Sequence, residues 1–357
     1  MSKPPFLLMK HDFQAPSYAR LRLCVLTGVL MLCSACSHQE LTDLTDLTYG
    51  NLRQQAQQAH EFQFRDQGRA IYFRFDKSSS FHRQGSPVAT FLFVIAGSEC
   101  GSMQSYLPDY FRGLEGESGP LRIFILHKRH IEAGQEPGRS CSAAFVRDDY
   151  PERWLQDQTE FILASLAQAA AEGRPQHAPP ARVVVMGISE GAEIAPLLAL
   201  RIPAVTHLVL LGNGGMQPLD SYRLLATKTA TKAANADISR QLAALELALA
   251  RPAPADPDAP AALVNGRSWL YWSQLRELRH TDNLLALSLP IFMGMGEADA
   301  SVPVESAYYL QRRFAAAGKH NLSLHVYPGA DHGLRSASRL YLPDFMHQLD
   351  LWLQYSP

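Results

Sequence analysis

Residues 187–191 read Gly-Ile-Ser-Glu-Gly, a Gly-x-Ser-x-Gly pattern that places Ser189 as a candidate nucleophile. The five-residue pattern also occurs by chance, so its context decides its meaning. The apolar run 182–186 before it predicts a buried strand, and 190–200 after it predicts a helix. The glycines would then permit a tight turn that exposes the serine hydroxyl at the carboxyl end of a sheet. The backbone N–H of Glu190, at the helix N-terminus, is a candidate oxyanion donor.

A nucleophilic serine needs a general base, and the base needs a carboxylate that orients it. His332 follows the last expected strand and is the candidate base. Asp299 lies in a glycine-containing loop after the preceding expected strand and is the candidate acid, with Glu297 as the alternative. The simpler interpretation of Asp299 is a cap for the next helix. The order Ser189, Asp299, His332, with each residue in a loop after a strand, predicts a catalytic triad.

A second oxyanion donor is expected in the loop 96–102, which follows an earlier apolar run and reads Ala-Gly-Ser-Glu-Cys-Gly-Ser. Glycine there allows the backbone to approach a substrate oxygen closely. The N–H of Ser98 or that of Glu99 is the candidate donor, and the sequence does not choose between them. An ordinary glycine- and serine-containing turn is the simpler interpretation.

Apolar runs alternate with amphipathic stretches along most of the chain, which predicts an α/β fold with a mostly parallel sheet and helices on both faces. A stretch at 217–288 breaks the alternation: it has no strand signal and is expected to be a helical insertion. The expected strands are Ala70–Phe75, Ala89–Ala96, Leu121–His127, Arg182–Met186, Thr206–Leu211, Pro290–Met293 and Leu322–Tyr327.

On the basis of these motifs and this alternating pattern, the chain resembles the α/β-hydrolase superfamily. The segment Gly-Ile-Ser-Glu-Gly-Ala-Glu-Ile-Ala is similar to the nucleophile turn of the dienelactone hydrolase, acyl-thioester hydrolase and prolyl-oligopeptidase-like branches. The resemblance implies an eight-stranded, mostly parallel sheet with the helical insertion after the sixth strand. It also implies a Ser-His-Asp triad made of Ser189, His332 and Asp299. The loop Ala-Gly-Ser-Glu departs from the His-Gly-Gly-Gly of many lipases, which argues against a lipase.

The N-terminal residues predict export. Positive residues precede a short apolar run and small residues follow it, which is the layout of a signal peptide over residues 1–35. The next residue, Cys36, resembles the lipidated cysteine of bacterial lipoproteins, and Ser37 after it favours the outer membrane over inner-membrane retention. We therefore expect a lipid-anchored tether at 36–67, a hydrolase domain at 68–357 that contains the insertion 217–288, and a periplasm-facing location in the cell envelope.

Two of the five cysteines, Cys100 and Cys141, remain after the signal peptide and Cys36 are accounted for. In an oxidising compartment an isolated pair is a candidate disulfide, and two unpaired buried thiols are the alternative. Because Cys100 adjoins the predicted oxyanion loop, a bridge would support that loop.

Composition narrows the class of function. With 33 Lys and Arg against 34 Asp and Glu, the formal net charge is -1, which argues against a nucleic-acid partner. We find no zinc-ligand spacing and no phosphate-binding glycine loop, so we expect no metal and no organic cofactor. The first hypothesis is a carboxylesterase acting on a small acyl substrate. The alternatives are a peptidase or amidase for short envelope peptides, and a non-catalytic binding lipoprotein; the oligomeric state stays open.

Two further groups have two interpretations each. Trp269, Tyr271 and Trp272 in the insertion could line an acyl pocket, although packing against the sheet is the simpler interpretation. Residues 128–130 (Lys-Arg-His) follow an expected strand and could meet an anionic substrate, but we expect them to form a solvated loop.

Overall fold

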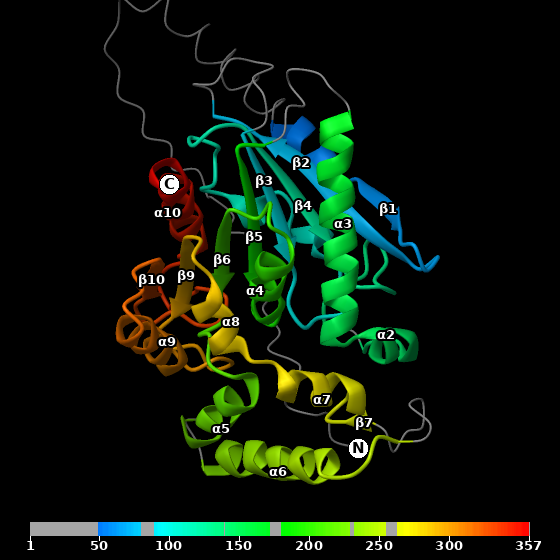
Figure 1. The fold of residues 1–357 in the computed structure, drawn as a ribbon, viewed down its shortest axis with the longest axis vertical. Coiled ribbons are helices and arrows are strands. Elements are labelled where there is room, and N and C mark those ends of the chain that lie inside the picture. Colours follow the sequence, from blue (N-terminus) through cyan, green and yellow to red (C-terminus); the bar gives the residue numbers. More distant parts are fainter. Residues whose placement is uncertain are drawn as a thin grey trace, which may run out of the picture.

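An eight-stranded sheet runs through the centre of the protein (Figure 1). The computed structural model describes residues 49–79, 89–138, 140–171, 180–228, 232–254 and 263–356. The strand order is β1-β2-β4-β3-β5-β6-β9-β10. The pairs β1–β2 and β2–β4 are antiparallel and the other five are parallel, so the expected fold class is confirmed. The strands are β1 (Ala59–Gln63), β2 (Arg69–Lys77), β3 (Thr90–Ile95), β4 (Leu121–Leu126), β5 (Arg182–Ile188), β6 (His207–Leu211), β9 (Ile291–Gly296) and β10 (Leu322–Tyr327).

Helices cover both faces of the sheet, and each face has its own apolar core. Because side chains alternate along a strand, Phe93 of β3 belongs to one core while its neighbours Leu92 and Val94 belong to the other. The first core packs against α3 (Pro151–Ala171), α4 (Gly191–Arg201) and α9 (Glu305–Ala316), and the second against α10 (Leu342–Tyr355). Double coverage explains why the central strands read as continuous apolar runs.

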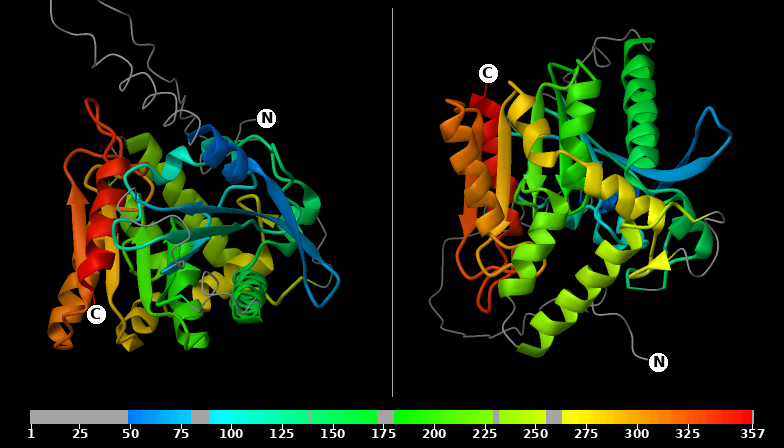
Figure 2. Two further views of the ribbon diagram at one scale, coloured as in Figure 1. Left: turned by 90° about the horizontal axis from the view of Figure 1, so that it is seen from above. Right: turned by 60° about the horizontal axis from the view of Figure 1, so that its bottom comes forward.

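The insertion after the sixth strand is helical, as expected. It consists of α5 (Pro218–Lys228), α6 (Lys232–Leu249), α7 (Trp269–Glu277) and α8 (His280–Ala286). Figures 1 and 2 show α5, α6 and α7 grouped beyond one end of the central strands. A hairpin of two short strands, β7 (Leu263–Val264) and β8 (Arg267–Ser268), was not expected. Two residues are too short to produce an alternating pattern.

Two tryptophans hold the insertion together. The indole N–H of Trp269 donates to the carbonyl of Ala248 at 3.2 Å, and that of Trp272 donates to Val264 at 2.7 Å. These contacts support the packing interpretation of both side chains over an acyl-pocket role.

The sheet begins earlier in the chain than the sequence suggested. Strand β1 lies within the segment expected to be a tether and pairs with β2 along the edge of the sheet. Its side chains are only partly covered, so it lacks the continuous apolar run of a central strand. Residues 49–57 are helical and place Leu52 and Ala56 on the second core. The expected signal peptide and Cys36 lie outside the described residues. Among those described, no helix is long and apolar enough to cross a membrane.

The expected disulfide between Cys100 and Cys141 is present. It joins the loop after β3 to the segment just before α2 (Ala143–Asp148). Cys100 is buried in a small apolar cluster with Ile131 and Phe145. The bridge therefore fixes the far end of the loop that was expected to supply an oxyanion donor.

Replacing both cysteines with serine should lower the free energy of unfolding by about 4 kcal/mol, because the bridge restrains a separation of 41 residues in the unfolded chain. Urea denaturation of the wild-type and double-variant proteins measures the difference. The same loss should follow mild reduction of the wild type. Equal stability of all three samples would show that the bridge does not form in solution.

Candidate active site

The turn between β5 and α4 places Ser189 at the carboxyl end of a central strand. Ser189 has a φ of 53°, in the left-handed region that non-glycine residues rarely adopt. Its backbone N–H donates to the carbonyl of Leu211, at the end of β6, at 2.7 Å. A Cβ at Gly191 would lie 2.2 Å from the carbonyl oxygen of Ile95 and 2.5 Å from that of Ala96. Only glycine therefore lets helix α4 begin directly against the loop after β3.

Three side chains from separate loops form one hydrogen-bonded chain at this turn. Nε2 of His332 lies 2.9 Å from Oγ of Ser189. Nδ1 of the same ring lies 2.7 Å from Oδ2 of Asp299. The structure thus brings the three predicted residues together in the order that a nucleophile, its base and an orienting acid require. The ring nitrogens have distinct partners, so a proton shared with Asp299 leaves Nε2 free to accept one from Ser189.

The two carboxylate oxygens of Asp299 have different partners. Its Oδ1 accepts backbone hydrogen bonds from Ser301 at 2.7 Å and Val302 at 2.9 Å, while Oδ2 meets His332. Asp299 does not cap the next helix, as the simpler interpretation expected: Ser301 and Val302 lie in the loop before α9, whose N-cap is Val304 and has no side-chain cap hydrogen bond. Glu297 is directed elsewhere: its Oε2 accepts the N–H of Gly329 at 2.9 Å. The alternative acid binds the loop after β10 and not the imidazole.

The environment of His332 raises its pKa. Burial alone lowers the pKa, because it disfavours the charged ring, but the hydrogen bond and charge of Asp299 outweigh burial. The charge of Asp331 acts in the same direction. The net pKa lies above the usual 6.5, so the ring is more ready to take up a proton than a free histidine is. Asp331 itself structures the loop by accepting the backbone N–H groups of Gly333 and Arg335, both at 2.9 Å.

The loop after β3 lies against the nucleophile turn. A Cβ at Gly97 would be 3.3 Å from Cβ of Ser189, so the loop passes the serine at van der Waals distance. Ser98 and Glu99, the two candidate donors, follow directly. Glu190, the third candidate, is the residue after the serine and precedes α4. The three backbone N–H groups predicted as candidate oxyanion donors therefore belong to the two segments that meet at Ser189.

A buried group of four charged side chains lies beside these segments, and the sequence did not reveal it. Nζ of Lys128 lies 3.0 Å from Asp149 and 3.0 Å from Glu190. Arg267, from the insertion, forms an ion pair with the other oxygen of Asp149. The side chain of Asp149 is fully buried, and the other three are at most 9% exposed. The expectation that Lys128 lies in a solvated loop is therefore wrong. Burial lowers the pKa of Lys128 to about 7.

The correction at Lys128 has a clear physical cause. Its side chain lies under Trp154, with Nζ 3.2 Å from the centre of the ring, and the two carboxylates come from distant segments. The neighbouring Arg129 is also paired, with Asp157 at 2.8 Å. No local pattern marks such residues as buried, because their partners are remote in the sequence.

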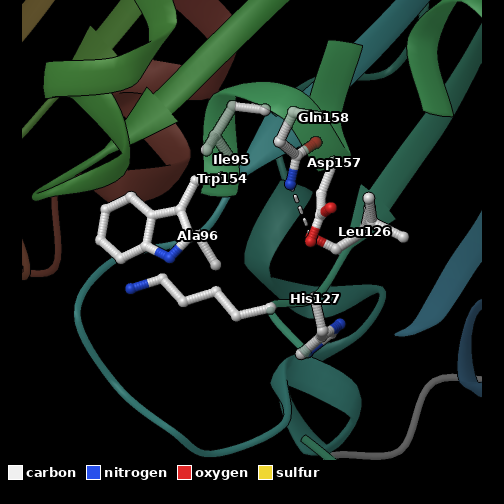
Figure 3. Close-up of a pocket in the computed structure, with 8 residues that line it drawn as sticks. Ile95, Ala96, Leu126, His127, Trp154, Asp157 and Gln158 are labelled. Atoms are coloured by element: carbon white, nitrogen blue, oxygen red, sulfur yellow. Dashed lines mark hydrogen bonds between the residues drawn. The ribbon is translucent and has the colours of Figure 1, made fainter. Parts of the chain in front are cut away.

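A small cavity lies behind the loop after β3 and does not include the three hydrogen-bonded residues (Figure 3). It is lined by Ile95, Ala96, Leu126, His127, Lys128, Trp154, Asp157 and Gln158. Gln158 closes one side by donating to the carbonyl of Leu126 at 3.1 Å. Burial lowers the pKa of His127 to about 4, so its ring is neutral, and it accepts the N–H of Met103 at 2.9 Å. Within the described ranges, no three His, Cys, Asp or Glu side chains gather to hold a metal ion.

Comparisons with known proteins agree with the fold. A family model described as alpha/beta hydrolase fold matches residues 140–336, more than half of the chain. Est1E from Butyrivibrio proteoclasticus superposes with a TM-score of 0.52 at 15% identity, over 83% of this chain and 98% of that one. An acylaminoacyl peptidase from Pyrococcus horikoshii gives 0.51 at 13% identity, over 84% and 41%. A puromycin-hydrolyzing peptidase from Mycobacterium tuberculosis gives 0.50 at 13%, over 82% and 37%. At such low identities these likenesses concern the fold. No curated protein sequence matches significantly.

The raised pKa of His332 can be measured directly. In Asp299→Asn the pKa of His332 should fall below its wild-type value, because the hydrogen bond and the carboxylate charge that stabilise the imidazolium are lost. Asp331→Asn is the matched control and should lower the pKa less, since Asp331 contributes only charge at a distance. An NMR titration of the ring protons measures both values. An unchanged pKa in Asp299→Asn would contradict the assigned contact.

Proposed function

Since this chain belongs to the α/β-hydrolase fold family, we propose that it is a serine hydrolase that cleaves carboxylic ester bonds. The observation that carries the proposal is the continuous contact from Ser189 through His332 to Asp299, with 2.9 Å and 2.7 Å between the paired atoms. Each member occupies a loop at the carboxyl end of a strand, where the family builds its sites. A binding lipoprotein would have no need of this alignment.

The first half of the reaction forms an acyl-enzyme. Oγ of Ser189 attacks the ester carbonyl carbon while Nε2 of His332 takes its proton. Asp299 holds the ring by Nδ1 and stabilises the imidazolium that forms. The negative oxygen of the tetrahedral intermediate is held by the N–H of Glu190 and by that of Ser98 or Glu99. The intermediate collapses when His332 returns the proton to the departing alkoxide, which leaves as an alcohol.

The second half releases the acid. Water enters where the alcohol left, and His332 takes one of its protons as the oxygen attacks the acyl carbon. The same N–H groups hold the second oxyanion. Collapse of this intermediate breaks the bond to Oγ, His332 returns the proton to Ser189, and the carboxylic acid departs. The raised pKa of His332 favours each step in which the ring must accept a proton.

We propose a small acyl ester as the substrate class. The insertion reaches the carboxyl ends of β3 and β5, where Arg267 contacts Ser98 and Tyr271 contacts Glu190, the residue after the candidate nucleophile. Amides and short peptides are the competing substrates, because the same acyl transfer applies to them. A panel of matched p-nitrophenyl esters, thioesters and aminoacyl anilides ranks the leaving groups. Faster turnover of the anilides would favour a peptidase.

Location remains a proposal that rests on sequence. The apolar run before Cys36 and the small residues at 34–35 support export, removal of residues 1–35 and lipidation of Cys36 in the cell envelope. Several acyl chains on one cysteine give stable anchoring, since each buried CH₂ contributes roughly 0.8 kcal/mol.

The triad assignment predicts that Ser189→Ala and His332→Ala each lower kcat by roughly 10⁴-fold, because the three groups act as a unit. Initial rates with a p-nitrophenyl ester measure the loss. Asp299→Asn should also lower kcat by orders of magnitude, since the ring loses its orienting acid.

Glu297→Gln is the matched control for Asp299→Asn. Both carboxylates follow β9, but only Asp299 contacts His332, while Glu297 contacts Gly329. We expect kcat within about threefold of the wild type for Glu297→Gln. Wild-type turnover by Ser189→Ala would refute the proposed function, and a larger loss in Glu297→Gln than in Asp299→Asn would reverse the choice of acid.

Lipidation is tested separately in a bacterial host. The full chain should incorporate labelled palmitate and remain with the membrane fraction, and Cys36→Ala should lose both properties because no thiol remains to be acylated. Cys24→Ala, inside the expected signal peptide, is the control and should incorporate the label normally. Equal labelling of Cys36→Ala and the wild type would overturn the proposed anchor.

A further inference from the structure

The insertion reaches into the site through Arg267, which lies on the short strand β8. Its Nη2 donates to the carbonyl oxygen of Ser98 at 2.6 Å. Its Nη1 forms an ion pair with Asp149, and its guanidinium lies 4.9 Å from the centre of the Tyr271 ring. The side chain is 8% exposed, so these contacts are made out of water. One planar group thus joins the loop after β3 to the insertion and to the segment before α3.

The other segment at Ser189 is held by the same group of residues. The Tyr271 hydroxyl, four positions after Arg267, donates to the carboxylate of Glu190. Lys128 contacts Glu190 and Asp149 together, and Asp149 pairs with Arg267. The contacts therefore form a continuous path from one candidate oxyanion segment to the other. In order, the path runs through Ser98, Arg267, Asp149, Lys128 and Glu190.

We infer that Arg267 is a positioning residue for the oxyanion site: it holds the peptide unit between Ser98 and Glu99 so that a backbone N–H faces the reacting carbonyl. This inference rests on the proposed ester hydrolysis. Arg267 donates to a backbone oxygen of the loop, and it acts on catalysis through that loop.

Peptide geometry supplies the mechanism. In a trans peptide the C=O of one residue and the N–H of the next point in opposite directions within one plane. Arg267 binds the Ser98 carbonyl from the side of the insertion, which fixes that plane and turns the N–H of Glu99 away from the guanidinium. A charged donor on the carbonyl also polarises the peptide, which strengthens its N–H as a donor. Glu99 is thereby the donor that Arg267 orients.

The loop needs such a restraint. Gly97 precedes the oriented peptide, and the chain lies close to Ser189 there, since a Cβ at Gly97 would be 3.3 Å from Cβ of Ser189. Glycine leaves the backbone with many accessible conformations. The hydrogen bond from Arg267 selects one of them before substrate arrives, and pre-organised donors are the ones that stabilise an oxyanion effectively.

Stability alone does not account for the charged group. Two basic and two acidic side chains are buried there together, and burying them costs solvation free energy that their attraction only partly restores. Apolar side chains of similar volume are often at least as stable in such places. What apolar side chains cannot do is bind the Ser98 carbonyl with a fixed direction.

The test compares two arginines of the insertion that each donate to a backbone carbonyl. Arg267 donates to Ser98, whereas Arg276 donates to Leu249 within the insertion itself at 3.1 Å. Arg267→Met should lower kcat for a p-nitrophenyl ester by about 100-fold with KM within about threefold, a loss comparable to removing one oxyanion donor. Arg276→Met should keep kcat within about threefold. A wild-type kcat in Arg267→Met would overturn the inference.

A second variant separates positioning from the effect of an unpaired charge. Arg267→Met leaves Asp149 without one of its partners, so we combine it with Asp149→Asn, which restores charge balance. We expect the double variant to recover thermal stability while kcat stays low. Recovery of kcat together with stability would show that charge imbalance caused the loss, and would overturn the positioning role.

Two readouts identify the step that is affected. The affinity for a boronic acid, which forms a tetrahedral adduct with Ser189, should fall in parallel with kcat, because both depend on the oxyanion donors. The acid limb of the pH–rate profile should not move, because His332 and Asp299 are untouched. A changed limb with unchanged boronic acid affinity would place the effect on the triad and refute the inference.

The conservative variant completes the series. Arg267→Lys keeps the positive charge but replaces the planar fork with one compact ammonium, which cannot contact Ser98 and Asp149 in the same way. We expect a kcat between those of the wild type and Arg267→Met. Full activity in Arg267→Lys would show that charge suffices and that direction does not matter, against the inference. If Ser189→Ala kept its turnover, the proposed hydrolysis itself would fail, which is a distinct result.

Discussion

The close approach of helix α4 to the loop after β3 is the constraint on which the rest of the site depends. With a Cβ at Gly191 only 2.2 Å from the carbonyl oxygen of Ile95, the two segments touch backbone to backbone. Ser189, at the same turn, has a left-handed conformation. The histidine and its acid are then added from β9 and β10, whose carboxyl ends meet the same edge.

Charged side chains form two separate groups at the site. At the surface of the turn, Asp299 raises the pKa of His332 and makes the ring a better proton acceptor. Beside the turn, the buried carboxylates of Asp149 and Glu190 pair with Lys128 and Arg267. In the proposed mechanism, the contact between Asp299 and His332 assists proton transfer. The buried group, through Arg267, orients the candidate backbone N–H donor in the loop after β3.

The insertion therefore has a part in the site beyond covering it. Tryptophans bind its pieces to one another, while Tyr271 and Arg267 extend from it to the two segments that flank the serine. Under the proposed mechanism, a change in the insertion would alter the candidate oxyanion donors and leave the contacts among Ser189, His332 and Asp299 in place. The disulfide at Cys100 restrains the same loop from its other end. The loop after β3 is thus held from both sides.

Local sequence determined the features that depend on short windows of chain. The strand, glycine turn and helix around Ser189 follow from residue type and periodicity alone, and so do most of the central strands. The order of Ser189, Asp299 and His332 could be read from the chain as well. Tertiary structure decided what depends on remote partners. Asp299 rather than Glu297 meets the imidazole because the loops after β9 and β10 bring one carboxylate to Nδ1 of His332 and the other to the N–H of Gly329. Strand β1 exists because β2 offers an edge to pair with, although its own pattern is weak. Lys128 is buried because carboxylates from two distant segments, Asp149 and Glu190, pair with it, and no local sequence pattern identifies such remote partners.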